Sequence, residues 1–365
     1  MFIKRLELIN FRNYSNLNIE FINGFNILYG QNAQGKTNIL EAINYLSLLK
    51  SHRSVKDKEL IKWGKGKAYI KGVFQKNLGD FSVEVLISEE SRKEAKLNGI
   101  KQNKASEVIG NANVVIFSPD DLRLVKEGPE VRRKFIDNEL NQIKPKYQYY
   151  LSLYNKALFQ RNNLLKSNFD KSLIDVYDQQ LAEYGSYIVF HRIEFIKKLS
   201  IICRLFHRKI TDGKEELVIR YKGDVYEEDI NKIKEKLYLS YKNSIEEDLK
   251  KGYTSKGPQR DDLQIFLNGV DAKTFASQGQ QRTAAISLKL SEIEIIKGER
   301  GEYPILLLDD VMSELDILRQ KHLLDSLKGL QIILTITGID DLGRLDFKNK
   351  KIFEVVDGRV QIKEL

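Results

Sequence analysis

The stretch that decides the fold is Gly30-Gln31-Asn32-Ala33-Gln34-Gly35-Lys36-Thr37. It matches the pattern G-x-x-x-x-G-K-[ST], which binds nucleotide phosphates when it joins a strand to a helix. The apolar run Phe25–Tyr29 precedes it and is typical of a buried strand. Apolar residues then recur at helical spacing, namely Ile39, Ala42, Ile43 and Leu46. Strand, glycine loop and helix are the context that the pattern requires.

The residue types of this loop explain why it would hold phosphate. Gly30 and Gly35 allow the backbone to wrap closely around phosphate oxygens, and the N-terminus of the following helix directs free N–H groups at them. Lys36 is expected to meet the β- and γ-phosphates during catalysis, and the Thr37 hydroxyl to bind magnesium. We therefore predict a nucleoside triphosphate site that uses all of residues 30–37. A plain glycine turn is the alternative.

Length and composition limit the class of protein. The chain has 365 residues, of which 42% are hydrophobic and 30% charged, as in ordinary globular proteins of more than one domain. No apolar run approaches the length of a membrane span, and the N-terminal sequence is typical of a strand rather than a signal peptide. We therefore expect a cytoplasmic protein. The single cysteine, Cys203, excludes an internal disulfide and a cysteine-based zinc cluster.

The net charge indicates the kind of partner. The formal charge is +9 and the sequence pI is near 9.2. Such a balance favours a polyanionic partner, most simply nucleic acid. A lysine-rich enzyme without such a partner is the alternative.

Patterns along the chain divide it into three segments. Strand patterns dominate residues 1–127, including an antiparallel meander over residues 69–104 with a tight hairpin at Asn98-Gly99. After Gly128-Pro129 the pattern becomes mainly helical over residues 128–255, and strands alternate with helices again over residues 256–365. The sequence predicts an α/β nucleotide-binding head, with a mixed sheet and an antiparallel meander, into which a mainly helical lobe is inserted.

Aromatic and basic residues are interleaved early in the helical segment, as in Tyr147, Tyr154, Phe159 and Arg161. Such mixing suits contact with nucleic acid. A tyrosine stripe on a helix is more often packed in a core, because aromatic side chains bury large areas. Packing is the favoured interpretation here.

An acidic pair at the end of a later strand completes the expected nucleotide site. The continuous apolar run Ile305–Leu308 is typical of a buried parallel strand, and it ends in Asp309 and Asp310. A carboxylate in the place of Asp309 holds magnesium in nucleotide hydrolases. Asp310 is placed to polarise the attacking water as a general base. Acids at strand ends are common, so the pair indicates a nucleotide site only in combination with the phosphate loop.

A second anion-binding pattern lies at the start of a later helix. Ser277 and Gly279 in the run Ser277-Gln278-Gly279-Gln280-Gln281 combine a hydroxyl, a bare backbone and a helix N-terminus. One nucleotide does not need two such sites from one chain. We therefore expect each chain to offer this second site to the nucleotide of its partner. An ordinary serine-capped helix is the alternative.

Other single residues are weaker candidates. Arg12 lies in a loop between two predicted strands, where it would face a nucleotide or only solvent. The run Thr335-Ile336-Thr337 ends another strand, and a hydroxyl there would sense the γ-phosphate. Asp316 follows the acidic strand at the place where a dimer seam would pass.

This set of motifs, in this order, resembles the ABC-type ATPase heads of SMC-like DNA-maintenance proteins. Longer stretches resemble the bacterial RecF family of recombination mediators from the first strand to the last. These stretches are LINFRNY at 8–14, GQNAQGKTNILEAI at 30–43, FSPDDLRLVKEGPEVRRKFID at 117–137, GPQRDDL at 257–263, SQGQQRTAAISLKLSE at 277–292 and LLLDDVMSELD at 306–316. Their combination is highly specific.

The resemblance implies ATP and Mg2+ as cofactors, homodimerisation on ATP, DNA binding and weak DNA-stimulated ATP hydrolysis. The DNA would be double-stranded, and a preference for junctions with single strands stays open. The family acts in replication, recombinational gap repair and the SOS response by helping to load RecA with RecO and RecR. The family pattern assigns phosphate to Lys36, magnesium to Thr37 and Asp309, and the catalytic water to Asp310. It assigns the γ-phosphate of the partner to Ser277 with Gly279.

Two departures from the family pattern leave roles open. Gln259 stands where the family usually has histidine, and Thr337 or Thr335 occupies the switch position. The glutamine loop of the family would correspond to the region of residues 117–121. The alternative function is the ATPase subunit of a membrane transporter, which the basic charge and the inserted helical segment disfavour. A small-molecule kinase would leave Ser277 unexplained.

Overall fold

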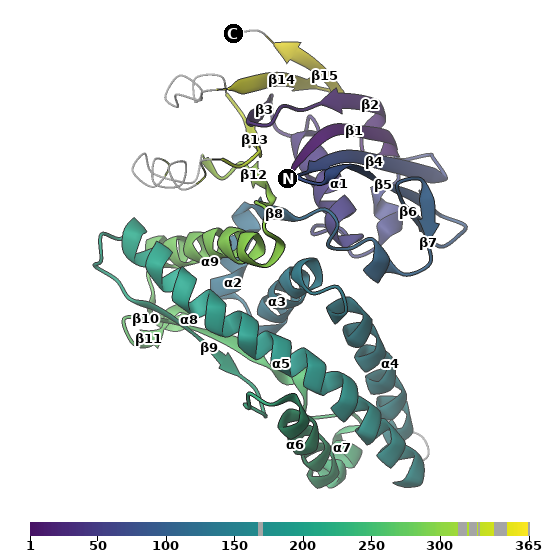
Figure 1. Cartoon of the computed structure of the whole chain (residues 1–365), viewed down its shortest axis with the longest axis vertical. Helices are drawn as coiled ribbons and strands as arrows, with labels where there is room; N and C mark the ends of the chain where they lie inside the picture. The colour runs from purple at the N-terminus through teal and green to yellow at the C-terminus, as the bar shows by residue number, and fades with distance from the viewer. Residues whose placement is uncertain (167–170, 313–319, 321–326, 328, 339–348, 364–365) are drawn as a thin grey trace. The chain divides into compact units, whose positions relative to one another are not determined.

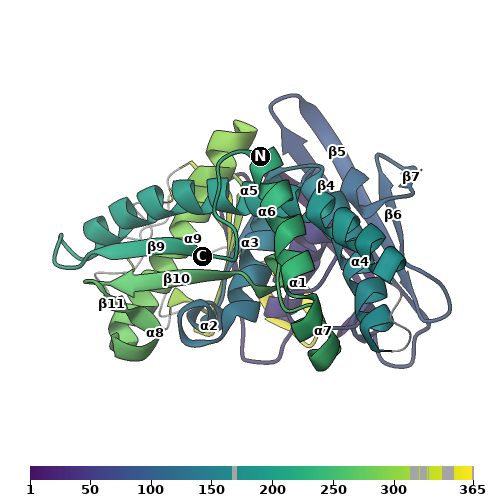
Figure 2. The same cartoon turned by 90° about the horizontal axis from the view of Figure 1, so that it is seen from below.

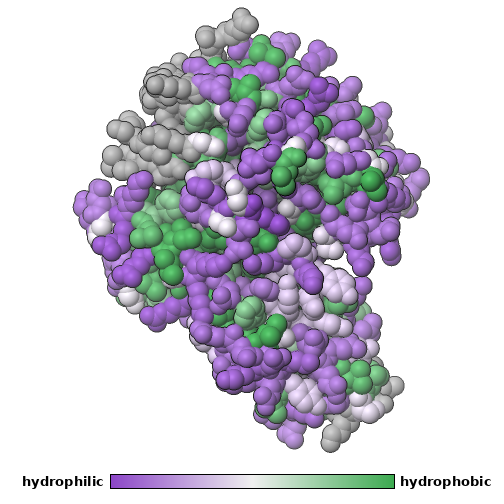
Figure 3. Space-filling model, viewed as in Figure 1, coloured by the Kyte–Doolittle hydropathy of each residue, from purple (hydrophilic) through white to green (hydrophobic). Residues whose placement is uncertain are grey.

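The computed structural model describes residues 1–166, 171–312, 320, 327, 329–338 and 349–363. Contacts between residues divide the chain into two compact units. The first unit comprises Met1–Asp121 and Glu292–Leu365, and the second comprises Leu122–Ser291. Each unit is described below by itself. The face of the molecule in Figure 3 is largely hydrophilic, with hydrophobic side chains in small patches.

The first unit contains an antiparallel sheet that is six-stranded within the described residues. Its order is β2-β1-β4-β5-β6-β7 (Figure 1). The strands are β1 Phe2–Phe11, β2 Tyr14–Glu20, β4 Lys67–Lys76, β5 Gly79–Ser88, β6 Glu94–Leu97 and β7 Ile100–Gln102. Asn98 and Gly99 join β6 to β7 at φ values of 51° and 77°, the left-handed pair that a two-residue hairpin needs. The predicted meander and its hairpin are confirmed.

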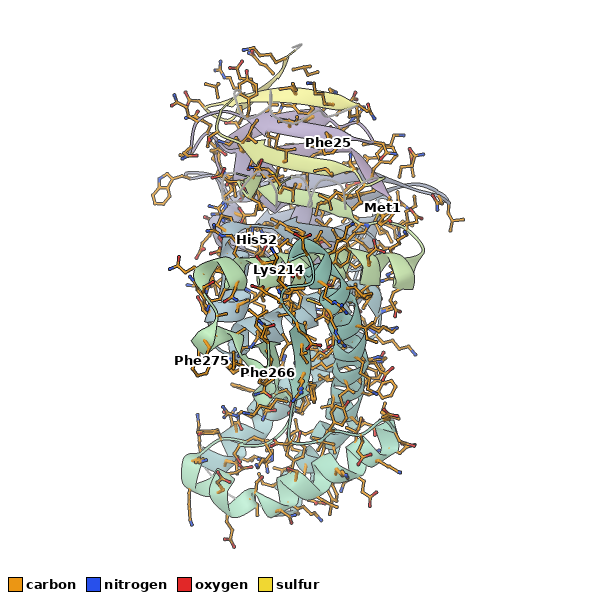
Figure 4. The ribbon with its side chains drawn as sticks, turned by 90° about the vertical axis from the view of Figure 1, so that its left-hand side faces the viewer. Met1, Phe25, His52, Lys214, Phe266 and Phe275 are labelled. Atoms are coloured by element: carbon orange, nitrogen blue, oxygen red, sulfur yellow. The ribbon has the colours of Figure 1, made fainter. Side chains whose placement is uncertain are left out.

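A second sheet of the same unit carries the phosphate loop. Its order, again six strands in the part of the chain described, is β15-β14-β3-β13-β12-β8, and every pair except β14 with β15 is parallel. The strands are β3 Phe25–Tyr29, β8 Val114–Phe117, β12 Ile305–Asp309, β13 Ile332–Ile336, β14 Lys350–Val356 and β15 Arg359–Lys363. Figure 4 labels Phe25, the first residue of β3. β12 and β13 are buried along their whole length, as continuous apolar runs predict.

Helix α1, Lys36–Leu48, connects the two sheets through one core. Its apolar residues Ile39, Ile43 and Leu46 are fully buried, and they share a hydrophobic cluster with side chains of both sheets. The helix ends at Leu49, which adopts the left-handed conformation with φ 51°, a conformation that glycine more often takes at the end of a helix. Short 3-10 turns complete the unit at η1 Asp57–Leu60, η2 Ala105–Glu107 and η3 Pro119–Leu122.

The second unit combines helices with a small sheet. The helices are α2 Arg123–Lys126, α3 Pro129–Ile143, α4 Tyr147–Lys166, α5 Lys171–Ile210, α6 Ile230–Asn243, α7 Ile245–Lys251, α8 Ala272–Phe275 and α9 Gln278–Arg300, which continues into the first unit. The sheet has the order β11-β10-β9, with β9 Leu217–Lys222, β10 Asp262–Leu267 and β11 Val270–Asp271, and η4 Pro258–Arg260 precedes β10. Figure 2 shows this sheet beside α5, and Figure 4 labels Phe266 on β10 and Phe275 at the end of α8. The mixed α/β fold with a mainly helical second unit agrees with the predicted fold class.

Some element boundaries differ from those predicted. The run Ser118-Pro119-Asp120-Asp121 predicts a helix start, with a serine cap, a proline in the first turn and acids behind it. The structure gives only the 3-10 turn η3 and the short α2 there, because Gly128-Pro129 follows closely and a residue before proline avoids the helical conformation. The charged run over residues 229–251 predicts one helix, but the structure separates α6 from α7 at Ser244.

Strand pairing also changes the grouping of residues 256–291. The sequence placed them with the C-terminal part of the head, whereas their contacts place them in the second unit. The reason is that β10 pairs with β9 along its length, from Asp262 opposite Lys222 to Leu267 opposite Leu217. This pairing joins residues 40 to 50 positions apart, which local patterns do not predict.

The tyrosine stripe of α4 is mainly packing, as favoured above. Tyr147 and Tyr154 are buried, and the Arg161 guanidinium is fully buried between Asp178 and Asp248. Phe159 is exposed. In the ranges that the structure describes, no helix has the length and apolar character needed to cross a membrane.

Candidate nucleotide-binding site

Three parallel strands end at one edge of the second sheet, and this edge carries the candidate site. β3 leads into the phosphate loop, and β12 ends at Asp309. β13 lies between them, with Thr335 opposite both Leu28 and Asp309. Because the carboxyl ends of parallel strands meet at the same edge, the loop and the acid are brought together from residues far apart in the sequence.

The loop adopts a conformation that its glycines make possible. The φ values of Gly30 and Gly35 are 153° and 115°. A Cβ at Gly30 would lie 2.3 Å from the carbonyl oxygen of Val355, and one at Gly35 would lie 2.6 Å from Asn13 Nδ2. Both positions therefore exclude side chains, and α1 begins at Lys36, directly after Gly35.

Hydrogen bonds to the phosphate loop hold the side chain of Lys36. Its Nζ donates to the carbonyl oxygens of Gly30 (2.5 Å) and Gln31 (2.8 Å). Burial lowers the pKa of Lys36, while the charges of Asp310 and Asp309 oppose that effect. The ammonium group is thus already positioned over the loop.

Asp309 is the acceptor of a compact hydrogen-bond group. Thr37 Oγ1 donates to Asp309 Oδ1 at 2.8 Å, and Thr335 Oγ1 donates to the same oxygen at 3.0 Å. The N–H of Asp310 donates to Thr335 Oγ1 at 2.9 Å, and Asp310 has a left-handed φ of 52°. Burial raises the pKa of Asp309, although the hydrogen bonds from Thr37 and Thr335 act in the opposite direction.

The chemistry of this group fits a magnesium ion. Hydroxyl and carboxylate oxygens are its preferred protein ligands, and Mg2+ usually takes only one or two carboxylates together with substrate phosphates and water. Among the described residues there is no cluster of three or more His, Cys, Asp or Glu that could hold a metal by itself. Thr37 and Asp309 therefore suit a cation that arrives with the nucleotide.

Replacing Asp309 with asparagine tests two separate effects of its carboxylate: the effect on the stability of the nucleotide-free fold and the effect on binding of the cation. Because burial raises its pKa, the folded chain binds this proton more tightly than the unfolded chain does. The contribution of Asp309 to stability is present below the pKa of the unfolded state and is lost as the pH rises through the raised pKa of the folded state. We expect nucleotide-free Asp309→Asn to melt above wild type at pH 8, and this difference to shrink at pH 4.

The same variant should lose magnesium-dependent stabilisation. Asn Oδ1 accepts the hydrogen bonds of Thr37 and Thr335 but carries no charge, so we expect ATP–Mg2+ to bind at least about tenfold more weakly. Thermal melting with and without ATP–Mg2+ measures both effects, with the exposed Asp80→Asn as control. Melting below wild type at pH 8, or full stabilisation by ATP–Mg2+, would contradict the assignment.

Arg12 is engaged by groups beside the loop. Its Nε and Nη2 donate to the two carboxylate oxygens of Glu41 at 2.9 and 2.8 Å, and Nη2 also donates to Ser54 Oγ. Burial would raise the pKa of Glu41, but hydrogen bonds from Arg12 and Ser51 hold it below its usual value. Arg53 Nη1 donates to Asn38 Oδ1 at 3.1 Å on the first turn of α1. The predicted contact of Arg12 with nucleotide stays a prediction.

Two turns contact the loop from outside, through hydrogen bonds that the sequence did not predict. Asn13 Nδ2 donates to the Gln34 carbonyl oxygen at 3.0 Å, and Tyr14 Oη donates to the Gly35 carbonyl oxygen at 3.1 Å. In the turn between β14 and β15, the N–H of Asp357 donates to Gln34 Oε1 at 2.6 Å. Both turns have local signals in the sequence, the run LINFRNY and the pair Asp357-Gly358, but neither signal predicts a contact with the phosphate loop.

Ser277 caps α9 and leaves the helix N-terminus exposed. Its Oγ accepts from the N–H of Gln280 at 3.3 Å, and Gln280 Oε1 accepts from the N–H of Ser277 at 2.9 Å, which is a reciprocal capping box. Gln280 Nε2 donates to Glu215 Oε1, and Glu215 Oε2 lies 3.0 Å from Nε2 of the buried His207. The serine-capped helix is therefore present, and Ser277 and Gly279 are both exposed at its start.

The remaining predicted residues occupy varied places. In the loop, Gln31, Asn32 and Ala33 are exposed. Thr337 is exposed directly after β13, so Thr335 is the threonine that contacts Asp309. Gln259 accepts a hydrogen bond from Tyr154 Oη, a structural use that needs no imidazole. In the segment 117–121, Phe117 is the last residue of β8 and pairs with Leu308 of β12, and residues 118–121 follow the strand. Asp316 and most of the helix expected over 317–327 lie outside the described residues.

These features define a class before any comparison with known proteins. A phosphate loop between β3 and α1, a buried aspartate at the end of β12 and a helical unit in the middle of the chain are the parts of a P-loop ATPase head of the ABC type. The family model described as RecF/RecN/SMC N terminal domain matches residues 2–340. The DNA replication and repair protein RecF of Clostridium novyi (strain NT) is 47% identical over 361 residues, 99% of both chains. The chain therefore belongs to the RecF family.

Solved structures agree with this assignment. A structure of the recombination mediator protein RecF with ATP, in the RecFOR pathway, covers 100% of this chain and 98% of its own, with a TM-score of 0.92 and 39% identity. An Smc head bound to the C-winged helix domain of ScpA covers 100% of this chain with a TM-score of 0.57 and 18% identity, which shows the shared fold alone.

Proposed function

We propose that this protein is an ATP-dependent DNA-binding clamp that dimerises on ATP and hydrolyses ATP weakly, with stimulation by DNA. One observation carries the proposal: Lys36, Thr37 and Asp309 meet at one strand edge, with Thr37 Oγ1 2.8 Å from Asp309 Oδ1. A lysine, a hydroxyl and a carboxylate in this order are what ATP–Mg2+ requires. The solved structure of a RecF relative with ATP supports ATP as the nucleotide.

Hydrolysis would use the groups around Asp309. Lys36 would hold the β- and γ-phosphates, and Thr37 with Asp309 would hold Mg2+, which neutralises charge that develops on the phosphates. Asp310 follows Asp309 directly and would act as the general base for the attacking water. Its N–H is fixed to Thr335 Oγ1, which ties the position of the base to that of the magnesium ligand. Arg12 and Thr337 remain candidates for further nucleotide contact.

Dimerisation would complete the site from a second chain. The N-terminus of α9, with Ser277 and Gly279, is exposed and offers a hydroxyl and the N–H groups of a helix start. We propose that these groups bind the γ-phosphate held by the partner. ATP would then join two heads, and hydrolysis would separate them.

The cellular role is proposed from the family. RecF relatives are named for DNA replication and repair, and the solved relative for the RecFOR pathway. We infer that this protein binds double-stranded DNA in the cytoplasm, works with RecO-type and RecR-type mediators to help load RecA, and acts in gap repair and SOS induction. Its charge of +9 suits such a polyanion. A membrane-transporter subunit lacks any comparable support, because the relatives above match the chain along its whole length.

The role of Ser277 in the partner's site is testable by substitution. Ser277→Arg places a large cation at the start of α9, so we expect ATP binding to persist in the monomer while dimerisation and hydrolysis are lost. Ser277→Ala is the matched control, because it removes only the helix cap, which is worth about 1 kcal/mol. Light scattering and phosphate release measure the two effects.

Mixing variants makes the test sharper. A chain with Ser277→Arg still has Lys36, and a chain with Lys36→Ala still has Ser277. If the site is shared, an equimolar mixture regains hydrolysis that neither chain has alone, because one of the two composite sites is complete. Normal hydrolysis by Ser277→Arg alone would refute the shared site.

A further inference from the structure

A tight turn at residues 62–65 is fixed firmly to the first unit. The N–H of Lys65 donates to the Lys62 carbonyl oxygen at 3.0 Å, and the N–H of Lys62 donates to the Asn10 carbonyl oxygen at 2.8 Å. Lys62 Nζ donates to the Asn13 carbonyl oxygen at 2.9 Å and to Ser15 Oγ at 2.7 Å. Gly64 has a φ of 74°, which suits the third position of a type II turn. The turn is thus a defined element rather than a loose loop.

Trp63 stands at the tip of this turn and is almost completely exposed. It is the only tryptophan of the chain, and 98% of its surface is accessible. Tryptophan is highly buried on average in folded proteins, because it carries a large apolar area. The indole makes no ring stacking or hydrogen bond with any residue that the structure describes. Its exposure on an anchored turn contributes nothing to packing and needs another explanation.

Positive charge surrounds the indole. The turn and its exit read Lys62-Trp63-Gly64-Lys65-Gly66-Lys67, with lysines and glycines but no acid. Lys65 and Lys67 are exposed, and no acidic side chain among the described residues forms an ion pair with either. Acids occur on either side of this stretch: Asp57 and Glu59 lie in η1 before the turn, and the N–H of Glu89 donates to the Gly66 carbonyl oxygen. Lys65 and Lys67 thus follow the exposed indole at two and four positions along the chain.

We propose that Trp63 and its lysines form a contact site for single-stranded nucleic acid, in which the indole stacks on an unpaired base and Lys65 and Lys67 contact the adjoining phosphates. Aromatic faces combined with basic side chains are the recurrent means of binding single strands without sequence preference. The bases of an intact duplex are stacked on each other and present only their edges, so the indole favours an unpaired base. This inference rests on the proposed DNA-binding function and adds a contact site for one form of DNA.

The lone tryptophan provides its own probe. We expect a 12-residue oligothymidylate to quench the emission of the full chain in a saturable manner, because stacking places the base on the indole. We expect a blunt duplex of the same length to quench less. Added salt should weaken the oligonucleotide binding, because the lysines replace counterions on the strand. Poly-L-glutamate serves as a polyanion without bases.

Substitution measures the contribution of stacking. Trp63→Ala should weaken binding of a fluorescently labelled oligothymidylate by about tenfold, whereas Trp63→Phe should keep most of it. Leu78→Ala is the matched control, since Leu78 is fully exposed on another turn of the same unit. Melting temperature serves as the fold check, because both side chains are exposed.

The outcomes distinguish this site from the general function. If duplex or labelled oligonucleotide binds while Trp63 emission and the Trp63→Ala affinity stay unchanged, the stacking site is refuted and DNA binding stands. If poly-L-glutamate quenches as strongly as the oligonucleotide, the surface suits an acidic protein partner and the base-stacking proposal is refuted. If neither DNA form binds, both this inference and the proposed function fail.

Discussion

Lys36→Ala is expected to lower ATP affinity by at least about 100-fold, because it removes a charge that meets the β- and γ-phosphates in a partly buried loop. The lysine is already positioned by the Gly30 and Gln31 carbonyl oxygens, so its side chain loses little conformational entropy when ATP binds to the wild-type chain. Isothermal titration with ATP–Mg2+ measures the affinity. Loss of ATP should also abolish dimerisation in the same sample.

The control must separate a phosphate contact from a general change in charge. Lys101→Ala removes an exposed lysine of the same unit that pairs with Glu94 at the surface, so we expect its ATP affinity to equal that of wild type. If Lys36→Ala binds ATP within about threefold of wild type, the phosphate loop is not the nucleotide site. Equal losses in both variants would instead indicate a nonspecific electrostatic effect.

Asp310→Asn is expected to slow ATP hydrolysis by about 10²- to 10⁴-fold while leaving ATP affinity close to that of wild type. The range is that of a positioned general base. Asparagine tolerates the left-handed conformation, so the φ of 52° and the hydrogen bond from the N–H to Thr335 Oγ1 should persist. The substitution therefore removes basicity with little change in the backbone. Single-turnover phosphate release isolates the chemical step from product release.

The chain offers a matched control for this substitution. Asp212 is an exposed aspartate with a nearly identical φ of 51°, located between α5 and β9 in the second unit. Asp212→Asn tests the effect of placing asparagine at such a position, and we expect normal hydrolysis. Wild-type hydrolysis by Asp310→Asn would show that another group activates the water.

The parts of the site that the sequence predicted are those with local signals. The loop at residues 30–37 is a contiguous motif whose glycines each meet a steric requirement that the structure shows. Asp309 was found because an apolar strand ended abruptly in an acid. Both signals lie within a few residues of the chain. The tertiary structure was needed only to bring Asp309 to Thr37, and the parallel order of β3, β13 and β12 does so.

The parts that the sequence did not predict depend on partners far apart in the chain. Glu41 is fully buried on α1 and looked like one more helical residue, because its partners Arg12 and Ser51 come from other segments. The choice between Thr335 and Thr337 depended on where β13 ends, since residues two apart on a strand share a face. The turn at Asp357 reaches Gln34 across more than three hundred residues. No local pattern carries such information.

The ATP-gated dimer is tested by the solution mass of Asp310→Asn, measured by light scattering with and without ATP–Mg2+ and then with a short DNA duplex. We predict a mass of 42.3 kDa without nucleotide and twice that mass with ATP–Mg2+, with the duplex bound to the dimer. Ser277→Arg added to the same chain should keep the monomer mass under all conditions. A monomer of Asp310→Asn with ATP, Mg2+ and duplex present would contradict the ATP-gated dimer and the role of Ser277 in the partner's site.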